Sequence, residues 1–177
     1  GFNSISWNSG AKFIWGNDLK LDNVIYFRKK VLAPLANSTV SNFDFSISGT
    51  NGSNLNIDNT CDGLSKSPGI TWKSVPPAAK SLILIMDTIP GPARPGETQI
   101  GNHYYITKFN ILPSTGSFAE GAITPYSPPC SQGPGTKEYR FFLFALNRLL
   151  PNDQKFDGAA LIAIGEKEAI AKASHIL

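Results

Sequence analysis

The clearest hydrophobic pattern in the chain is a continuous apolar run that ends on an acid. Residues 82–86 are all apolar, and Asp87 follows them directly. An uninterrupted run of this length predicts a strand that is buried on both faces. The predicted strand 81–87 therefore carries the Asp87 carboxylate to the end of a sheet, where we expect a cleft to begin.

Three further segments alternate with the period of a strand. In the segment 42–47, Phe43, Phe45 and Ile47 alternate with polar residues. The segment 103–111 is predicted to have one face made of His103, Tyr105, Thr107, Phe109 and Ile111. The segment 137–146 is predicted to have one face made of Lys137, Tyr139, Phe141, Leu143 and Ala145.

Only the end of the chain has a helical pattern, and turn-rich segments separate the strands. Asp157 is a suitable N-cap, and an apolar stripe with a charged back extends from there to Ala173, which predicts a helix. The segment 88–101 contains three prolines and three glycines and is predicted to be a long loop, a feature that is usually functional. These elements predict a mainly β architecture, a β-sandwich or barrel with a C-terminal helix packed on it.

Composition agrees with a β-rich fold in one domain, 1–177. Charged residues make up 16% of the 177 residues, and there are 16 Gly and 13 Pro. The net charge is +3 and the longest basic cluster is 28–30, so we expect no nucleic acid partner. No apolar run approaches the roughly 18 residues of a membrane span, and no signal-like segment begins the chain, which favours a soluble protein.

The two cysteines, Cys61 and Cys130, leave two interpretations open. A disulfide would close a loop of about 70 residues and stabilise the fold by roughly 4 kcal/mol. The alternative is a pair of reduced thiols. A disulfide would favour an oxidising location, periplasmic or secreted rather than cytoplasmic. Two cysteines without a second pair of ligands make a poor zinc site, and we expect no metal and no cofactor.

Three polar residues could form a site, because each lies at the edge of a predicted strand beside a Pro/Gly loop. If Asp87, His103 and Lys137 converge, Asp87 would orient the imidazole of His103, leaving the other ring nitrogen and the Lys137 ammonium to bind an anion such as phosphate. Hydroxyl groups to line this pocket are available from Tyr105, Tyr126 and Tyr139. The structural alternatives are a turn residue at Asp87, an edge histidine at His103 and a solvated charge at Lys137.

Enzymatic chemistry has weaker support. Cys130, His103 and Asp87 match the composition of a thiol nucleophile, a base and an orienting acid. However, Cys130 follows Pro129, and no helix begins after it to lower the thiol pKa. The chain also has no Gly-x-Ser-x-Gly motif and no phosphate-binding Gly loop followed by Lys and Ser or Thr. We therefore expect a protein that is not an enzyme.

These residues together resemble the phosphatidylethanolamine-binding protein family, also called Raf kinase inhibitor proteins, and in particular its bacterial and archaeal branch. The resemblance covers about residues 43–175 and leaves 1–42 as an atypical N-terminal segment. It rests on the order and spacing of Thr60-Cys61-Asp62-Gly63, Ser67-Pro68, Trp72, Val75-Pro76, the strand 81–87, the segments 103–111, 126–130 and 135–144, and the closing helix.

The resemblance implies a β-sandwich with a flanking helix and a small pocket for phosphate, phosphorylated residues or phospholipid headgroups. It implies no enzymatic activity for most members, which act as inhibitors or scaffolds of kinases and proteases. The family's strand-end acid matches Asp87, its pocket tyrosine matches Tyr139, and its Tyr-x-Gly-Pro-Cys-Pro-Pro loop matches 126–132, which includes Tyr126 and Pro129.

Three positions depart from the family pattern. The acid motif Asp-Pro-Asp-x-Pro is reduced to Asp87-Thr88-Ile89-Pro90. Tyr105 occupies the place of one pocket histidine, with His103 two residues earlier, and Lys137 occupies the place of the other. We expect a non-enzymatic protein that binds a small anionic ligand at these positions. The alternative is an inhibitor of a protease or kinase that uses the loop 88–101 as its contact surface and keeps only a vestigial pocket.

Overall fold

The computed structural model describes residues 3–6, 12–15, 41–51, 53–92, 95–130 and 137–177. The chain divides into two compact units, 1–36 and 37–177. In the first unit, β1 (Asn3–Ser6) and β2 (Lys12–Trp15) form an antiparallel pair in which Asn3 lies opposite Trp15. Most of the segment 1–42, predicted to be atypical, lies outside the described residues.

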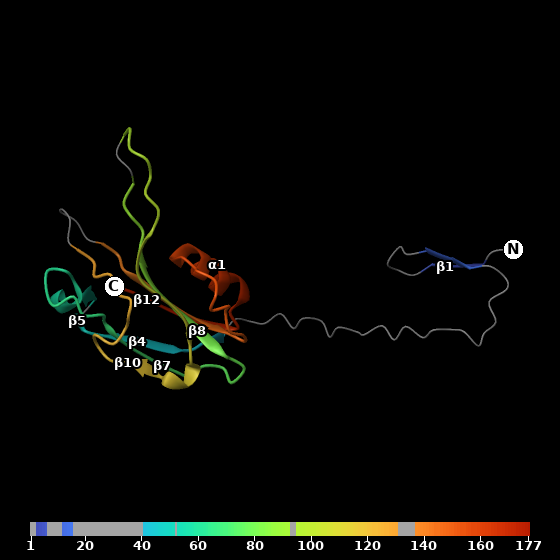
Figure 1. The fold of residues 1–177 in the computed structure, drawn as a ribbon, viewed down its shortest axis with the longest axis horizontal. Coiled ribbons are helices and arrows are strands. Elements are labelled where there is room, and N and C mark those ends of the chain that lie inside the picture. The colour runs from blue at the N-terminus through green and yellow to red at the C-terminus, as the bar shows by residue number, and fades with distance from the viewer. Residues whose placement is uncertain (1–2, 7–11, 16–40, 52, 93–94, 131–136) are drawn as a thin grey trace. The chain divides into compact units, whose positions relative to one another are not determined.

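In the part of the second unit that the structure describes, there are two main sheets and one α-helix (Figure 1). The five-stranded sheet has the order β3 (Ser41–Asn42), β12 (Ala171–Ile176), β11 (Arg140–Leu146), β8 (Ser81–Thr88) and β9 (His103–Ile111). The three-stranded sheet has the order β10 (Ser117–Phe118), β7 (Gly69–Lys73) and β4 (Asp44–Ser48). Smaller elements are the pair β5 (Thr50–Asn51) and β6 (Asn54–Leu55), the 3-10 turns η2 (Ile57–Asn59) and η3 (Pro113–Thr115), and the helix α1 (Gly158–Glu168).

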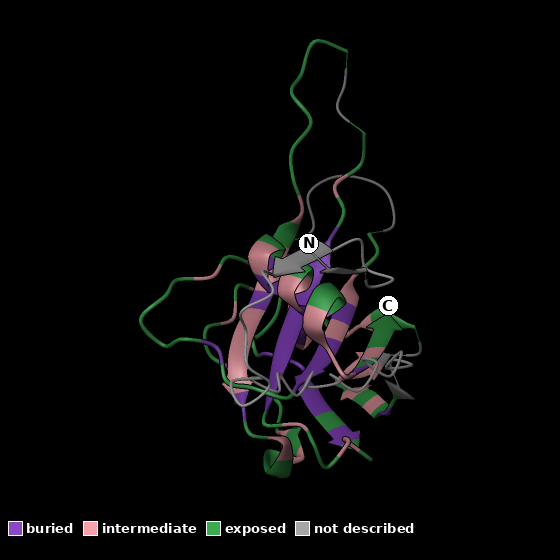
Figure 2. Ribbon diagram, turned by 90° about the vertical axis from the view of Figure 1, so that its right-hand side faces the viewer, coloured by how far each residue is buried: buried purple, intermediate pink, exposed green. Residues whose placement is uncertain are grey.

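The large sheet separates two apolar cores, as predicted for a strand buried on both faces. All eight residues of β8 are buried. Leu84 and Met86 pack toward the three-stranded sheet, whereas Ile83 and Ile85 pack toward α1. Figure 2 shows the buried residues concentrated in these central strands. The predicted β-sandwich with a helix on one face is confirmed, and among the described residues no helix is long and apolar enough to cross a membrane.

The strand β11 confirms the alternation predicted for 137–146, although it begins at Arg140 rather than at residue 137. Phe141 and Leu143 belong to the core between the sheets, and Phe144 and Leu146 to the core under α1. Antiparallel pairing with β8 is continuous from Arg140 to Leu146, so neighbouring side chains on the two strands share the same face.

The predicted extension of the helix to Ala173 is wrong. The carboxylate of Asp157 caps the helix by accepting a hydrogen bond from the amide of Ala160 at 2.7 Å, as predicted, but α1 ends at Glu168. The next residues form β12, which pairs antiparallel with β11. Without β12, one edge of β11 would have unpaired backbone groups beside a buried core, and this tertiary pairing outweighs the helical pattern of the local sequence.

The single face predicted for 103–111 is also wrong, because β9 contains a bulge near its start. Asp87 lies opposite Tyr104, but the preceding residue of β8, Met86, lies opposite Ile106. Tyr105 is therefore the extra residue, and both Tyr105 and Ile106 pack toward the core between the sheets.

A second irregularity lies near the end of β9. Leu84 lies opposite Lys108, whereas Leu82 lies opposite Ile111. Asn110 has a φ of +55° at this point. As a result Phe109 packs under α1, while Ile111 belongs to the core between the sheets.

The close contact of α1 with the sheet generates a stability prediction. A Cβ atom on Gly165 would lie 2.4 Å from the buried ring of Phe144. We expect Gly165→Ala to lower the free energy of unfolding by about 1–3 kcal/mol in urea titrations, because the ring has to shift in a packed core. The control Gly91→Ala meets no atom within 4 Å. Equal stability of the two variants would contradict this packing.

Candidate functional site

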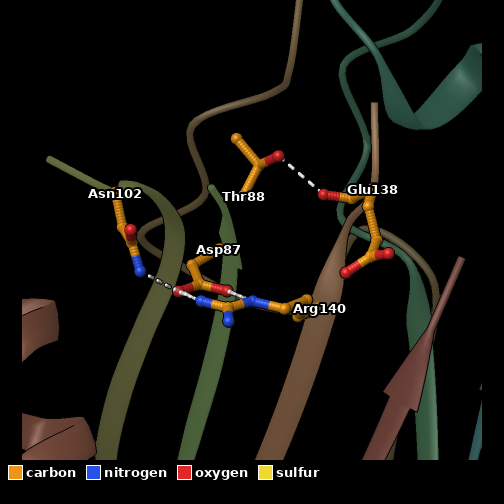
Figure 3. Close-up of polar contacts among 5 residues, drawn as sticks. All are labelled: Asp87, Thr88, Asn102, Glu138 and Arg140. Atoms are coloured by element: carbon orange, nitrogen blue, oxygen red, sulfur yellow. Dashed lines mark hydrogen bonds and ion pairs between the residues drawn. The ribbon is translucent and has the colours of Figure 1, made fainter. Parts of the chain in front are cut away.

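The acid predicted at the end of the sheet forms a partly buried ion pair with Arg140 (Figure 3). Asp87 is fully buried, and the register of β8 and β11 places Arg140 directly opposite it. Nε of Arg140 donates to Oδ1 of Asp87 at 2.9 Å, and Nη2 donates to Oδ2 at 2.5 Å. Such a two-point contact neutralises the carboxylate and fixes its orientation.

Hydrogen bonds beside this ion pair hold both ends of the loop 88–101. At one end, Oγ1 of Thr88 donates to the carbonyl of Glu138 at 2.6 Å. At the other end, Nδ2 of Asn102 donates to Oδ2 of Asp87 at 2.9 Å. Between them, the described parts of the loop contain no helix or strand, as predicted, and the loop projects from the sheet as the yellow-green segment at the top of Figure 1.

The ion pair lies on the face of the sheet that α1 covers. Side chains alternate along β8, and Ile85, two residues before Asp87, packs under α1. The guanidinium of Arg140 lies 5.3 Å from the centre of the Phe142 ring, which packs against the same core. Nearby, burial raises the pKa of Tyr104, and the negative charge of Asp87 adds to this shift.

Three of the predicted tyrosines gather on the opposite face, toward the three-stranded sheet. The rings of Tyr105 and Tyr139 meet edge to face with their centres 5.6 Å apart. Tyr126 joins them through a backbone bridge to Ile106, and its hydroxyl donates a hydrogen bond to the carbonyl of Asn59. We call Tyr105, Tyr126 and Tyr139 the tyrosine cluster.

The hydroxyls of the tyrosine cluster are neutral donors well above physiological pH. Burial is the main cause that raises the pKa of all three residues above the usual value of 10.0. Proximity to Tyr139 raises the pKa of both Tyr126 and Tyr105, and the pKa of Tyr105 is raised further by the charge of Asp87. Neutral phenols can donate hydrogen bonds to an anion, which phenolates cannot.

Among the described residues, the remaining predicted site residues form no hydrogen bond with the Asp87 carboxylate. His103 is exposed and pairs with Thr88 in the sheet, and among the described residues no hydrogen bond joins it to Asp87. Lys137 is exposed, and its ammonium donates to the carbonyl of Cys130 at 3.4 Å. Pro129 is buried, and its carbonyl accepts a hydrogen bond from the amide of Cys61 at 3.0 Å.

The two cysteines are joined in a disulfide that links positions 69 residues apart. Closing a loop of this length stabilises a fold by roughly 4 kcal/mol in the chain-entropy model. Because the sulfur of Cys130 is bonded to Cys61, it is not available as the thiol nucleophile of the enzymatic alternative in this form.

Sequence reasoning did not identify Arg140 and Asn102 as partners of Asp87. A signal for Arg140 was present, since it is the single cation in the otherwise apolar segment 139–146. Aligning that segment antiparallel to the run 82–86 places the cation beside the acid. Asn102 had no comparable signal, because a loop of about a dozen residues separates it from Asp87.

The ion pair generates a second prediction. Arg140→Met leaves the buried Asp87 carboxylate without its cation and should lower the free energy of unfolding by about 3–5 kcal/mol. The double variant Asp87→Leu/Arg140→Met removes both charges and should recover most of this loss in a double-mutant cycle by urea unfolding.

The matched control is the exposed ion pair of Arg148 and Glu168, whose side chains are 44% and 34% exposed. Arg148→Met should cost at most about 1 kcal/mol. A double variant that is as unstable as Arg140→Met alone would show that the unpaired Asp87 carboxylate is not the cause of the lost stability.

Comparisons with known proteins agree on one family. The family described as phosphatidylethanolamine-binding protein matches residues 45–176. A UPF0098 protein of Chlamydia muridarum is 29% identical over 127 residues, which cover 64% of this chain and 82% of that protein. A UPF0098 protein of Methanothermobacter thermautotrophicus is 32% identical over 109 residues, which cover 51% of this chain and 67% of that protein.

Solved structures support the same fold. A phosphatidylethanolamine-binding protein homologue from Chlamydia trachomatis superimposes with a TM-score of 0.65 at 24% identity, covering 77% of this chain and 95% of that chain. YbcL of E. coli superimposes with a TM-score of 0.61 at 18% identity, covering 77% of this chain and 98% of that chain. With the match over residues 45–176, the chain belongs to the phosphatidylethanolamine-binding protein family.

Proposed function

We propose that this protein is a non-enzymatic binding protein that takes a small anionic group, phosphate or a phosphorylated headgroup, at the tyrosine cluster and Lys137. The observation that carries the proposal is the edge-to-face pair of Tyr105 and Tyr139, whose ring centres lie 5.6 Å apart and which pack on one face of the sheet. Membership of a family described as binding phosphatidylethanolamine supports the same ligand class.

The donor set fits an anion. Lys137 comes two residues before Tyr139, in the segment that leads into β11, and its side chain is exposed. Two neutral phenols and one ammonium can each donate a hydrogen bond to phosphate oxygens. The hydroxyl of Tyr126 already donates its hydrogen bond to the carbonyl of Asn59, so we give Tyr126 the role of orienting the tyrosine cluster and not of binding the anion.

The position of Asp87 favours this proposal in a revised form. Its carboxylate is paired with the Arg140 guanidinium on the face toward α1, and this cation offsets part of the negative charge that acts on Tyr105. Asp87 then supports the site indirectly. Its bonds to Arg140 fix the end of β8, which carries Thr88, against the start of β11, which Tyr139 directly precedes.

Titration calorimetry with inorganic phosphate and with phosphoethanolamine tests the proposal. Lys137→Ala should weaken phosphate binding roughly 10-fold or more, because it removes a charge-assisted hydrogen bond. Tyr139→Phe removes a neutral hydrogen bond and should weaken binding roughly 2- to 10-fold. Tighter binding of phosphoethanolamine than of phosphate would identify a lipid-type headgroup as the source of the ligand.

The control for the charge change is Lys155→Ala, which removes an exposed lysine from the turn before α1. It should bind phosphate like the wild type. Absence of binding at millimolar ligand, or equal affinity of Lys137→Ala and Lys155→Ala, would reject the anion site.

A second candidate function is inhibition of a protease or kinase through the loop 88–101. The observation that favours it is the projection of this loop from the sheet, with Ile89 59% and Ile100 63% exposed near its two ends (Figure 1). Apolar side chains displayed on a loop whose ends are held by Thr88 and Asn102 suit insertion into a protease cleft.

Inhibition assays against chymotrypsin, which accepts apolar side chains, test this function. We expect an inhibition constant of about micromolar for the wild type and a loss of at least roughly 10-fold for Ile89→Asp/Ile100→Asp, because a charge cannot enter an apolar pocket without cost. Leu149→Asp, an equally exposed apolar position outside the loop, is the control. Inhibition that survives in the loop variant would exclude the loop as the contact surface.

A further inference from the structure

The disulfide joins two segments that both contact the tyrosine cluster. Cys61 lies two residues after Asn59, whose carbonyl accepts the hydroxyl of Tyr126. Cys130 ends the segment 126–130, which begins with Tyr126 itself. Both cysteines are exposed, so a reductant in solution can reach the bond.

The two ends of the segment 126–130 are held in different ways. At the start, the amide of Ser127 donates to the carbonyl of Tyr105 at 2.9 Å, and Tyr126 forms a bridge with Ile106. These contacts attach the start directly to β9. At the far end, the amide of Cys61 donates to the carbonyl of Pro129 at 3.0 Å, beside the disulfide.

The far end of the segment also contacts Lys137. The Lys137 ammonium donates to the carbonyl of Cys130 at 3.4 Å, and that carbonyl belongs to the disulfide-bonded residue. An exposed lysine side chain loses considerable conformational freedom when it is held in one place. The disulfide therefore holds in position the acceptor that orients this lysine.

We propose that the Cys61–Cys130 disulfide is a redox-sensitive positioning element of the anion site, which a dithiol reductant switches to a weaker binding state. This inference rests on the proposed function, because the affected ligand is the anion of that site. Reduction consumes one dithiol. Its thiolate attacks one cysteine sulfur, which breaks the Cys61–Cys130 bond and expels the other cysteine as a thiolate. The second dithiol sulfur, after it loses its proton, attacks the dithiol sulfur of the mixed disulfide and expels the first cysteine. The two protons of the dithiol end on the two protein thiols, and the dithiol becomes a cyclic disulfide.

A purely stabilising crosslink would behave differently. If the disulfide acted only on the unfolded chain, reduction would lower the stability of all described strands together and leave the native positions of Tyr126 and Lys137 unchanged. A positioning role instead predicts a local effect. The Pro129–Cys61 contact loosens, the Ser127–Tyr105 contact remains, and the fold of the two sheets is retained.

The experiment compares the oxidised protein with the same protein in dithiothreitol, which is uncharged and does not compete for an anion site. Amide hydrogen exchange should show at least about 10-fold faster exchange at Cys61 after reduction, with little change at Ser127 and in β8. Phosphate affinity, measured by calorimetry under the same conditions, should fall roughly 3- to 10-fold because the lysine is no longer preorganised. Removal of the reductant and reoxidation should restore both values.

The two measurements separate the possible failures. Unchanged exchange at Cys61, or an equal acceleration at Cys61 and in β8, overturns the positioning role whatever the phosphate result. Faster exchange at Cys61 with unchanged phosphate affinity would show that the disulfide does not control phosphate binding. Failure of the oxidised protein to bind phosphate rejects the proposed function, and with it the control of binding, while the exchange data still decide the local role of the disulfide.

The variant Cys61→Ser/Cys130→Ser provides a second test without reductant. It should match the reduced wild type in exchange and affinity, and dithiothreitol should have no effect on it. An effect of dithiothreitol on this variant would show that the change does not come from the disulfide. If the variant does not fold, reduction of the wild-type protein decides alone.

Discussion

The structure of the larger unit depends on how one carboxylate is buried. Asp87 has no exposed surface, and a buried charge is tolerated only when a cation and hydrogen-bond donors surround it. Arg140 and Asn102 meet this requirement with three hydrogen bonds. A shift of β11 against β8 by one residue would separate the charges and turn each side chain of β11 to the wrong core, so the ion pair and the apolar pattern specify the same register.

This register also divides the polar groups between the two faces of the sheet. With Asp87 on the face of α1, the next residue, Thr88, faces the other side and bonds to the backbone beside Tyr139. The bulge in β9 has a similar consequence, because it turns Tyr105 and Ile106 to the same face. The arrangement of the tyrosine cluster therefore depends on two features. One is the bulge in β9, and the other is the Asp87–Arg140 ion pair on the opposite face of the sheet.

The sequence predicts the regular parts of this fold better than its irregular parts. The strands β8 and β11 follow from their apolar patterns, because burial on both faces or strict alternation leaves few other structures open. The strand β12 could not be predicted in the same way. Its sequence, Ala-Lys-Ala-Ser-His-Ile, suits a helix as well as a strand, and pairing with β11 decides between them.

The site was predictable to a similar extent. The positions of Tyr105, Tyr126 and Tyr139 in strands and loops predict them as site residues, and the structure brings these three together. Asp87 was expected beside them, although strand alternation from Ile85 would have placed it on the opposite face. The bulge that turns Tyr105 inward has no sequence signal of its own, because bulges depend on the pairing of two strands.

The candidate site thus differs from the core in what holds it together. Tyr105 and Tyr139 are carried by β9 and by the segment that leads into β11, whose positions follow from apolar packing. Tyr126 and the acceptor of Lys137 lie in a segment without regular structure, where a few hydrogen bonds and the disulfide replace a strand ladder. Because a binding site needs its groups held to within a fraction of an ångström, the part built on irregular backbone is the part that limits its accuracy. Stability of the fold and order of the site are therefore separate properties in this protein, and a change that spares the two cores can still alter the site.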